Sequence, residues 1–246
     1  MPKVYLSPST QEYNLYYDGS GSEEYYMNLI ADYIEPYLTA SGIEFSRNSP
    51  SMTASGSAAD SNRDNYDLHV SIHSNASAET SQGSQQGSDI YYFESSTNGK
   101  RFADILQTNF KDIYPDPNNV DTIPNRTFVE LRRTNAPAAL IEVAYHDNAE
   151  DAEWIKANLQ PIAEAIARSI AEYLGVPFIS PNQTSYGTVN SYDGELNLRR
   201  MPTTQSDILA VLPNGTRIPI LGKTDGWYST NYNGTDGYVY AKYVTL

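Results

Sequence analysis

The sequence predicts an α/β fold with a mostly parallel, twisted sheet flanked by helices, followed by a small all-β barrel. Short apolar runs alternate with helical patterns over the first 175 residues, which is typical of a parallel sheet covered by helices. From residue 187 onwards, short strand-like runs are separated by turns rich in Gly and Asn. Between these parts, residues 178–186 lack hydrophobic periodicity and are expected to form a linker.

The elements of the first part follow from their hydrophobic periodicity. Residues 23–40 place apolar side chains on one helical face. Residues 138–145 are nearly all apolar, as expected for a strand covered on both faces. Asn148 can cap a long helix over about 150–174, which Gly175 ends. The remaining expected elements are strands at 4–6, 43–45, 67–73, 89–93 and 128–132, and a helix over about 98–113.

Charge and hydropathy exclude several classes of function. The chain has 16 basic and 30 acidic residues, and its net charge is −14. Residues 187–246 contain five of each sign, so the acidic excess belongs to the preceding part. Such a surface is repelled by nucleic acid and anionic lipid, and no nucleic-acid partner is expected. No apolar run has the length of a membrane span.

The first residues contain no apolar segment of signal-peptide length. The chain is therefore expected to be made in the cytoplasm and released by another route, or to have been trimmed.

Three polar residues stand where strands end or a helix begins. His73 closes an expected strand, Glu142 lies inside the most apolar strand, and Glu24 opens the first helix. Ligands of open α/β sheets bind outside the carboxyl ends of strands, so these side chains can converge. Each also has a structural explanation: a satisfied core histidine, a hydrogen-bonded carboxylate, and a partner of the helix dipole. The chain has three histidines and no cysteine, so any zinc site must combine histidine with carboxylates.

Four segments of the first part form an ordered pattern: 24–29 (EYYMNL), 67–76 (DLHVSIHSNA), 131–138 (LRRTNAPA) and 140–148 (LIEVAYHDN). The pattern resembles the zinc N-acetylmuramoyl-L-alanine amidases of the amidase-3 type. The resemblance implies Zn²⁺ held by Glu24 and His73, with Glu142 as the catalytic carboxylate that takes a proton from zinc-bound water and protonates the leaving amine. It also implies Asn75 and Arg132 as substrate-binding residues, Arg132 for a carbonyl or carboxylate of the stem peptide.

One element of that family pattern is missing. The family usually places its first zinc histidine in a Gly-His-Gly-Gly turn after the first strand, where this chain has residues 7–14 (SPSTQEYN). Either another residue completes the site, or metal binding is lost. His146, on the same side of its strand as the catalytic carboxylate, is the leading candidate for the third ligand. His69, Gln11 and Tyr13 are the alternatives.

The last part has a family pattern of its own. Its segments are 194–202 (GELNLRRMP), 215–216 (GT), 226–228 (GWY) and 237–239 (GYV). Their order resembles bacterial SH3 domains, which commonly attach hydrolases to cell-wall peptide. The expected organisation is a catalytic domain at 1–177, a linker at 178–186 and a wall-binding domain at 187–246.

Together these resemblances predict an enzyme of the bacterial cell wall. It would cleave peptidoglycan between N-acetylmuramic acid and L-alanine, as a phage endolysin or a bacterial autolysin. The alternative is a catalytically silent protein that binds the cell wall and lacks a complete zinc site.

Overall fold

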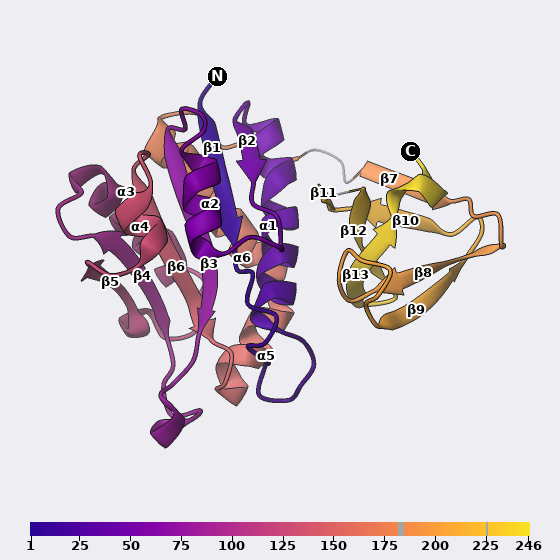
Figure 1. Cartoon of the computed structure of the whole chain (residues 1–246), viewed down its shortest axis with the longest axis horizontal. Coiled ribbons are helices and arrows are strands. Elements are labelled where there is room, and N and C mark those ends of the chain that lie inside the picture. The colour runs from indigo at the N-terminus through magenta and orange to yellow at the C-terminus, as the bar shows by residue number, and fades with distance from the viewer. Residues whose placement is uncertain (182–184, 225) are drawn as a thin grey trace. The chain divides into compact units, whose positions relative to one another are not determined.

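A computed structural model describes residues 1–181, 185–224 and 226–246 of the chain (Figure 1). The chain divides into two compact units, Met1–Ile179 and Ser180–Leu246. Part of the predicted linker, residues 182–184, lies outside the described residues, as does Asp225 of a predicted turn. Within the described part, no helix is both long and apolar enough to cross a membrane.

A six-stranded mixed sheet forms the centre of the first unit (Figure 1). The strand order is β2-β1-β3-β6-β4-β5, in which β4 runs antiparallel to β6 and all other neighbours are parallel. This confirms the predicted, mostly parallel sheet. The strands are β1 (Lys3–Pro8), β2 (Glu44–Arg47), β3 (Leu68–Asn75), β4 (Ser88–Phe93), β5 (Val120–Asn125) and β6 (Ala138–Tyr145).

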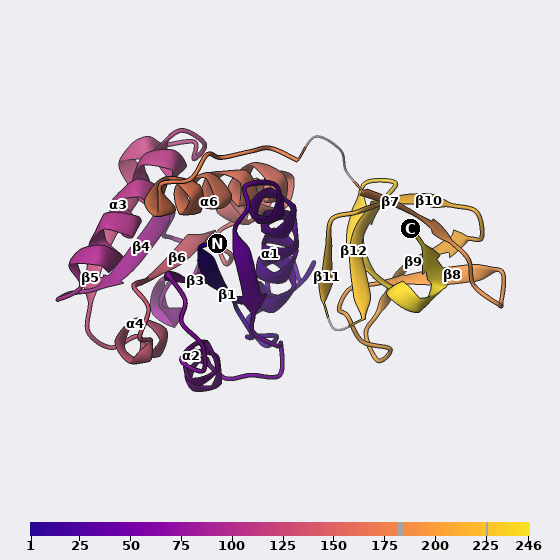
Figure 2. The same ribbon diagram turned by 90° about the horizontal axis from the view of Figure 1, so that it is seen from above.

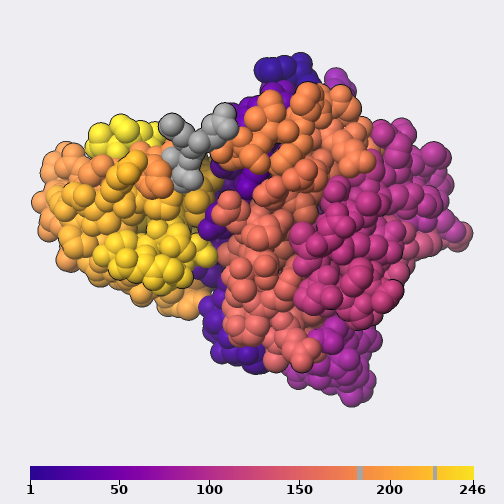
Figure 3. Space-filling model, turned by 180° about the vertical axis from the view of Figure 1, so that it is seen from behind, coloured from indigo at the N-terminus to yellow at the C-terminus, as the bar shows by residue number. Residues whose placement is uncertain are grey.

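Helices cover both faces of this sheet (Figure 2). Helices α1, α3 and α6 lie over one face, where Figure 3 shows α3 and α6 side by side, and α2 and α4 lie over the other. The central strands are therefore buried on both sides, as their apolar sequences require. The helices are α1 (Glu23–Ala40), α2 (Ala54–Ser61), α3 (Thr97–Lys111), α4 (Val129–Arg133), α5 (Ala149–Ala157) and α6 (Leu159–Leu174).

The segment expected as a strand at 128–132 is instead the short helix α4, and that prediction is wrong. The side chain of Asn125 accepts hydrogen bonds from the backbone N–H groups of Thr127 and Phe128. This Asx turn directs the chain into a helical turn rather than an extended run. Glu130 and Arg132, two positions apart in a helix, consequently point in different directions.

The long helix expected over 150–174 is divided at Asn158, whose backbone leaves helical geometry between α5 and α6. The side chain of Asn158 donates to the carbonyl of Trp154, which caps the end of α5. Gly175 ends α6 in the left-handed conformation, as predicted. Helix α2 and strand β5 were not predicted from the sequence.

The second unit is all-β in its described residues, as predicted. Its two antiparallel sheets have the orders β10-β7-β14 and β11-β12-β13-β8-β9. A core that includes Leu198, Leu212 and Val239 lies between them. The strands are β7 (Ser185–Val189), β8 (Glu195–Arg199), β9 (Ile208–Pro213), β10 (Arg217–Ile220), β11 (Gly222–Thr224), β12 (Trp227–Tyr232), β13 (Thr235–Tyr240) and β14 (Val244–Thr245).

Candidate active site

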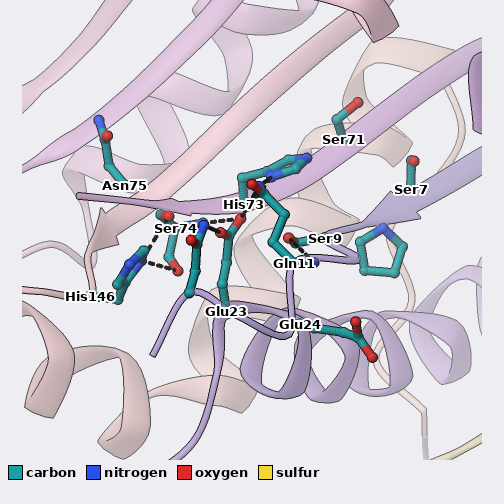
Figure 4. A network of polar contacts seen from close by, with 12 residues as sticks. Ser7, Ser9, Gln11, Glu23, Glu24, Ser71, His73, Ser74, Asn75 and His146 are labelled. Atoms are coloured by element: carbon teal, nitrogen blue, oxygen red, sulfur yellow. Dashed lines mark hydrogen bonds and ion pairs between the residues drawn. The ribbon is translucent and has the colours of Figure 1, made fainter. Parts of the chain in front are cut away.

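A partly buried histidine–glutamate pair lies at the carboxyl end of β3 (Figure 4). The Nδ1 atom of His73 lies 2.8 Å from Oε1 of Glu23, the first residue of α1. Gln11, in the loop after β1, places its Nε2 3.3 Å from that oxygen and 3.5 Å from His73 Nδ1. The strand end, the helix start and the first loop therefore meet at one point, which is the expected position for a ligand site in such a sheet.

The structure brings Glu23, and not Glu24, to His73. Ser22 caps α1 by accepting a hydrogen bond from the backbone of Tyr25, so both glutamates lie in the first turn. Successive helical side chains point about 100° apart, and Glu24 points away from His73 (Figure 4). Burial, together with the charge of Glu12, raises the pKa of Glu24 to about 7. Glu23 therefore replaces Glu24 as the candidate metal ligand.

The carboxylate of Glu23 is hydrogen-bonded on both oxygens. Asn14 donates to Oε2 at 2.7 Å, and the backbone N–H of Ser74 donates to Oε1 at 3.4 Å. Burial disfavours charge here, but hydrogen bonds led by the one from His73 hold the pKa of Glu23 below its ordinary value. Burial also opposes charge on His73, yet the hydrogen bond and charge of Glu23 raise the pKa of His73 to about 9.

Glu142 stands beside His73 in the sheet. The two residues are partners in the β3–β6 pairing, and Asp89 is the partner of Glu142 on β4. The Oε2 atom of Glu142 is buried and takes no hydrogen bond from any described residue. Burial, followed by the charges of Glu23 and Asp89, raises the pKa of Glu142 to about 8, against the influence of His73. Such a carboxyl group can accept or donate a proton near neutral pH.

His146 does not join this site. Its Nδ1 lies 2.9 Å from the carbonyl oxygen of Ser74 and 3.0 Å from the Ser74 hydroxyl, and its ring stacks on Tyr16. The reason is an irregularity in the β3–β6 pairing, where Asn75 pairs with Tyr145 although His73 pairs with Glu142. The extra residue in β6 reverses the alternation of side chains. His146 is therefore directed to the opposite side, and the expectation that it shares a side with Glu142 is wrong.

His69, which also lies on β3, contacts a different set of side chains and not the His73–Glu23 pair. Its Nε2 lies 2.9 Å from Oε2 of Glu130, and its Nδ1 lies 3.0 Å from the hydroxyl of Ser61. Ser71 donates to the same Glu130 oxygen at 2.6 Å. Burial disfavours charge on Glu130. The contacts that nevertheless keep its pKa below the ordinary value are headed by the hydrogen bond from His69. This second pair was not predicted, since the sequence carries no signal that brings α4 onto β3.

The two expected substrate-binding residues lie apart from the His73–Glu23 pair. Asn75, at the end of β3, donates through Nδ2 to Asp89 at 3.1 Å. Arg132 is exposed on α4 and borders a cavity of about 440 Å³ together with the β4–α3 connection, including Phe93 and Ser96.

A separate cavity of about 320 Å³ adjoins His73. One side is the loop after β1, another is the start of α2, and Glu130 forms part of the lining. Apart from His73 and Glu130, the side chains that line it are uncharged: Pro8, Ser9, Thr10, Gln11, Tyr13, Asn48, Met52, Thr53 and Ala54. The cavity is large enough for a substrate side chain.

The residues around His73 supply an incomplete set of ordinary zinc ligands. Among the described residues, no group of three histidine, cysteine or acidic side chains is placed to hold a metal ion. Glu23 and His73 are two suitable donors, and Gln11 stands beside both. Its amide also has an oxygen, currently accepting from Tyr13 at 3.0 Å. If that oxygen turned inward, it would add a third donor to the carboxylate and the imidazole, although an amide oxygen is not among the ordinary zinc ligands.

Comparisons with known proteins identify the class of the molecule. The family model described as N-acetylmuramoyl-L-alanine amidase, of the amidase-3 type, matches residues 14–172, which is more than half of the chain. The chain belongs to this family. A model of the bacterial SH3 domain matches residues 194–245 of the second unit.

Solved structures show the same fold for the first unit. The catalytic domain of CwlV, an N-acetylmuramoyl-L-alanine amidase from Bacillus (Paenibacillus) polymyxa var. colistinus, is similar with a TM-score of 0.63 and 22% identity, covering 72% of this chain and all of that domain. An N-acetylmuramoyl-L-alanine amidase of Clostridium difficile 630 gives 0.61 and 20%, covering 71% and 97%.

A curated relative matches over a shorter stretch. The Bacillus subtilis (strain 168) protein YrvJ is 33% identical over 61 residues, which is 25% of this chain and 12% of YrvJ.

Proposed function

We propose that this protein hydrolyses the amide between N-acetylmuramic acid and L-alanine in peptidoglycan. The observation that supports this most is the buried Glu142 Oε2, which has no hydrogen-bond partner among the described residues and stands next to His73. An unsatisfied buried carboxyl oxygen is costly, and its retention in the interior indicates a chemical role.

The metal ligands in this proposal are Glu23 and His73, with the amide oxygen of Gln11 as the third. Zn²⁺ bound there would polarise the scissile carbonyl and lower the pKa of a bound water. Asn14 holds the second oxygen of Glu23, so the carboxylate keeps its orientation.

Glu142 performs the proton transfers. With its pKa raised to about 8, it can take the proton of the attacking water and pass it to the leaving L-alanine nitrogen. Arg132 is proposed to bind a carboxylate or carbonyl of the stem peptide in the cavity that it borders. Asn75 supports this region indirectly, since its amide donates to Asp89, the neighbour of Glu142.

The bacterial SH3 domain is proposed to hold the enzyme on cell-wall peptide, and the whole chain to act at the wall as an endolysin or autolysin. The competing proposal is a silent wall-binding protein. The position of Gln11 favours that alternative, because its amide nitrogen faces both Glu23 and His73.

A gain-of-ligand variant separates the two proposals. Gln11→His would supply an ordinary zinc ligand, with Gln82→His, an exposed glutamine, as the matched control. Zinc-loaded wild type is expected to release L-alanine amino termini from purified walls, and a chelator is expected to stop the release. Glu142→Gln is expected to lower the rate by at least about a hundredfold. Gln11→His is expected to equal or exceed the wild type.

Two outcomes would contradict the proposal. If only Gln11→His releases amino termini, the wild-type metal site is incomplete and the protein is a silent binder. If neither protein releases amino termini from walls that both proteins bind, the amidase proposal is wrong for this protein.

A further inference from the structure

Two cavities border helix α4, and they differ in the charges of their linings. One, of about 320 Å³, adjoins His73 and includes Glu130, and the other, of about 440 Å³, includes Arg132. Glu130 and Arg132 are two positions apart in α4, so their side chains point in different directions. The helix therefore contributes an acidic residue to one lining and a basic residue to the other.

The charged groups in the lining beside His73 are already matched. The Nδ1 atom of His73 lies 2.8 Å from Glu23, and Glu130 lies 2.9 Å from Nε2 of His69. Each charged group of this lining therefore has a partner of the opposite type outside it. A ligand in this cavity meets no unpaired charge, so a neutral group enters it at the least electrostatic cost.

The uncharged part of this lining suits a sugar. Tyr13 is 77% exposed, and its ring and the Met52 side chain supply apolar surface. The hydroxyl group of Thr10, which also lines the cavity, has no hydrogen bond to any described residue. A sugar ring has apolar C–H faces that pack on aromatic rings, and polar groups that bond to hydroxyls. The volume, at the lower end of the range of ligand pockets, suits one sugar rather than several residues of peptide.

The cavity that Arg132 borders has the opposite character. Arg132 is exposed, its side chain makes no ion pair with any described residue, and no acidic residue lines this cavity. An unpaired guanidinium group attracts carboxylates. The two halves of the proposed substrate differ in the same way. The stem peptide carries carboxylates, whereas the lactyl carboxyl group of the sugar is part of the cleaved amide, which leaves the sugar neutral.

We propose that the cavity beside His73 is the subsite for the N-acetylated sugar of the substrate, and that the stem peptide extends toward Arg132. This deepens the proposed function and rests on it for the identity of the substrate. Thr10, Tyr13 and Met52 then contact the sugar, and the two halves of the substrate bind through separate sets of residues.

The test measures binding without cleavage. Metal is removed by a chelator, and the full chain is titrated calorimetrically with two probes. The sugar probe is the neutral N-acetylmuramoyl-L-alanine methylamide, and the peptide probe is the anionic N-acetyl-L-alanyl-D-glutamic acid. Ala54→Trp places a large ring in the lining, and Ala59→Trp, at an exposed position of the same helix outside the lining, is the matched control.

Ala54→Trp is expected to weaken binding of the sugar probe at least about tenfold through steric exclusion and to leave the peptide probe unaffected. Arg132→Ala is expected to do the reverse, and Ala59→Trp to change neither affinity. A loss of the peptide probe instead of the sugar probe in Ala54→Trp, unchanged affinities in the folded variant, or no binding of the sugar probe by the wild type would overturn the inference.

A measurement on the wild type decides the matter even if Ala54→Trp does not fold. Met52 is one of four methionines, and its isotope-labelled methyl resonance is expected to shift with the sugar probe and not with the peptide probe. An absent or reversed response would refute the subsite. A protein that shows these preferences but never cleaves with zinc would keep the subsite and lose the amidase proposal. Cleavage of walls with an unchanged KM in Ala54→Trp would remove the subsite alone.

Discussion

Strand β3 carries two histidine–glutamate pairs on the same face, four residues apart, and they are built differently. His73 and Glu23 meet at the end of the strand, where Gln11 and Asn14 occupy the remaining positions around the carboxylate. His69 and Glu130 meet deeper in the unit, where the histidine is fully buried.

The difference between the pairs concerns which atoms are left for a ligand. Around Glu23, both carboxylate oxygens are bonded, and a metal would have to displace or turn the amide of Gln11. Around Glu130, the hydrogen bonds from His69 and Ser71 both end on one oxygen, and the residue lines a cavity. The first arrangement suits a reacting centre assembled from a helix start and a loop, and the second suits a structural role in the interior. Buried ion pairs alone do not distinguish these roles, but the distribution of hydrogen bonds does.

The largest expected difference between the pairs is in stability. Glu130→Ala leaves His69 buried without its partner, and we expect a loss of about 3 kcal/mol in the free energy of unfolding. Glu23→Ala should cost less, about 1–2 kcal/mol, because the His73 side chain is 14% exposed and can be solvated. Urea unfolding of both variants beside the wild type measures this. A larger loss in Glu23→Ala would reverse the assignment of the deeper pair as the structural one.

Zinc binding should depend on His73, the histidine of the more exposed pair, and not on His146. His73→Ala is expected to weaken Zn²⁺ binding by more than about a hundredfold, because it removes a proposed ligand. His146→Ala should retain zinc, since its ring contacts Ser74 and Tyr16. Zinc content after dialysis, measured on folded protein, checks both. Loss of zinc in His146→Ala together with retention in His73→Ala would refute the proposed ligand set.

The smallest expected effect on stability concerns the loop that carries Gln11 and Asn14. This loop contacts the His73–Glu23 pair. Lys156 of α5 bonds Asp18 in this loop at 2.7 Å. Partial burial opposes charge on Asp18, but hydrogen bonds from Lys156 and Ser20 lower its pKa to about 2. Because the folded-state pKa is depressed, the stabilisation is present above the unfolded value of about 3.9 and disappears as pH falls through about 2.

Asp18→Asn is therefore expected to destabilise the protein by less than about 1 kcal/mol at pH 6, since the pair lies at the surface and is only partly buried. The deficit relative to the wild type should shrink toward pH 2. Thermal unfolding of the two proteins across this range provides the measurement, and a deficit that grows on acidification would rule out the ion pair as its cause.

The fold was largely predictable because it depends on patterns that survive in a single sequence. The helical periodicity of 23–40 and the apolar run of 138–145 correspond to α1 and β6 with little change of boundary. The prediction failed at 128–132, because a short helix begun by one Asn125 side chain has no periodicity to detect.

The candidate site was predictable only in part. His73 and Glu142 are signalled by their places in apolar strands, and the structure makes them neighbours. The sequence alone does not choose between adjacent Glu23 and Glu24, which differ by one step of helical rotation.

What the sequence determines by itself is most of the order of strands and helices, the two-part organisation, and the presence of His73 and Glu142 near a strand end. Tertiary structure alone decides which side chains face them. An extra residue in β6 turns His146 away, the capped start of α1 directs Glu23 inward, and packing of α4 on β3 joins Glu130 to His69. The physical reason is that hydrophobic periodicity records which face of an element is buried, whereas ligand geometry depends on register and on the direction of single side chains.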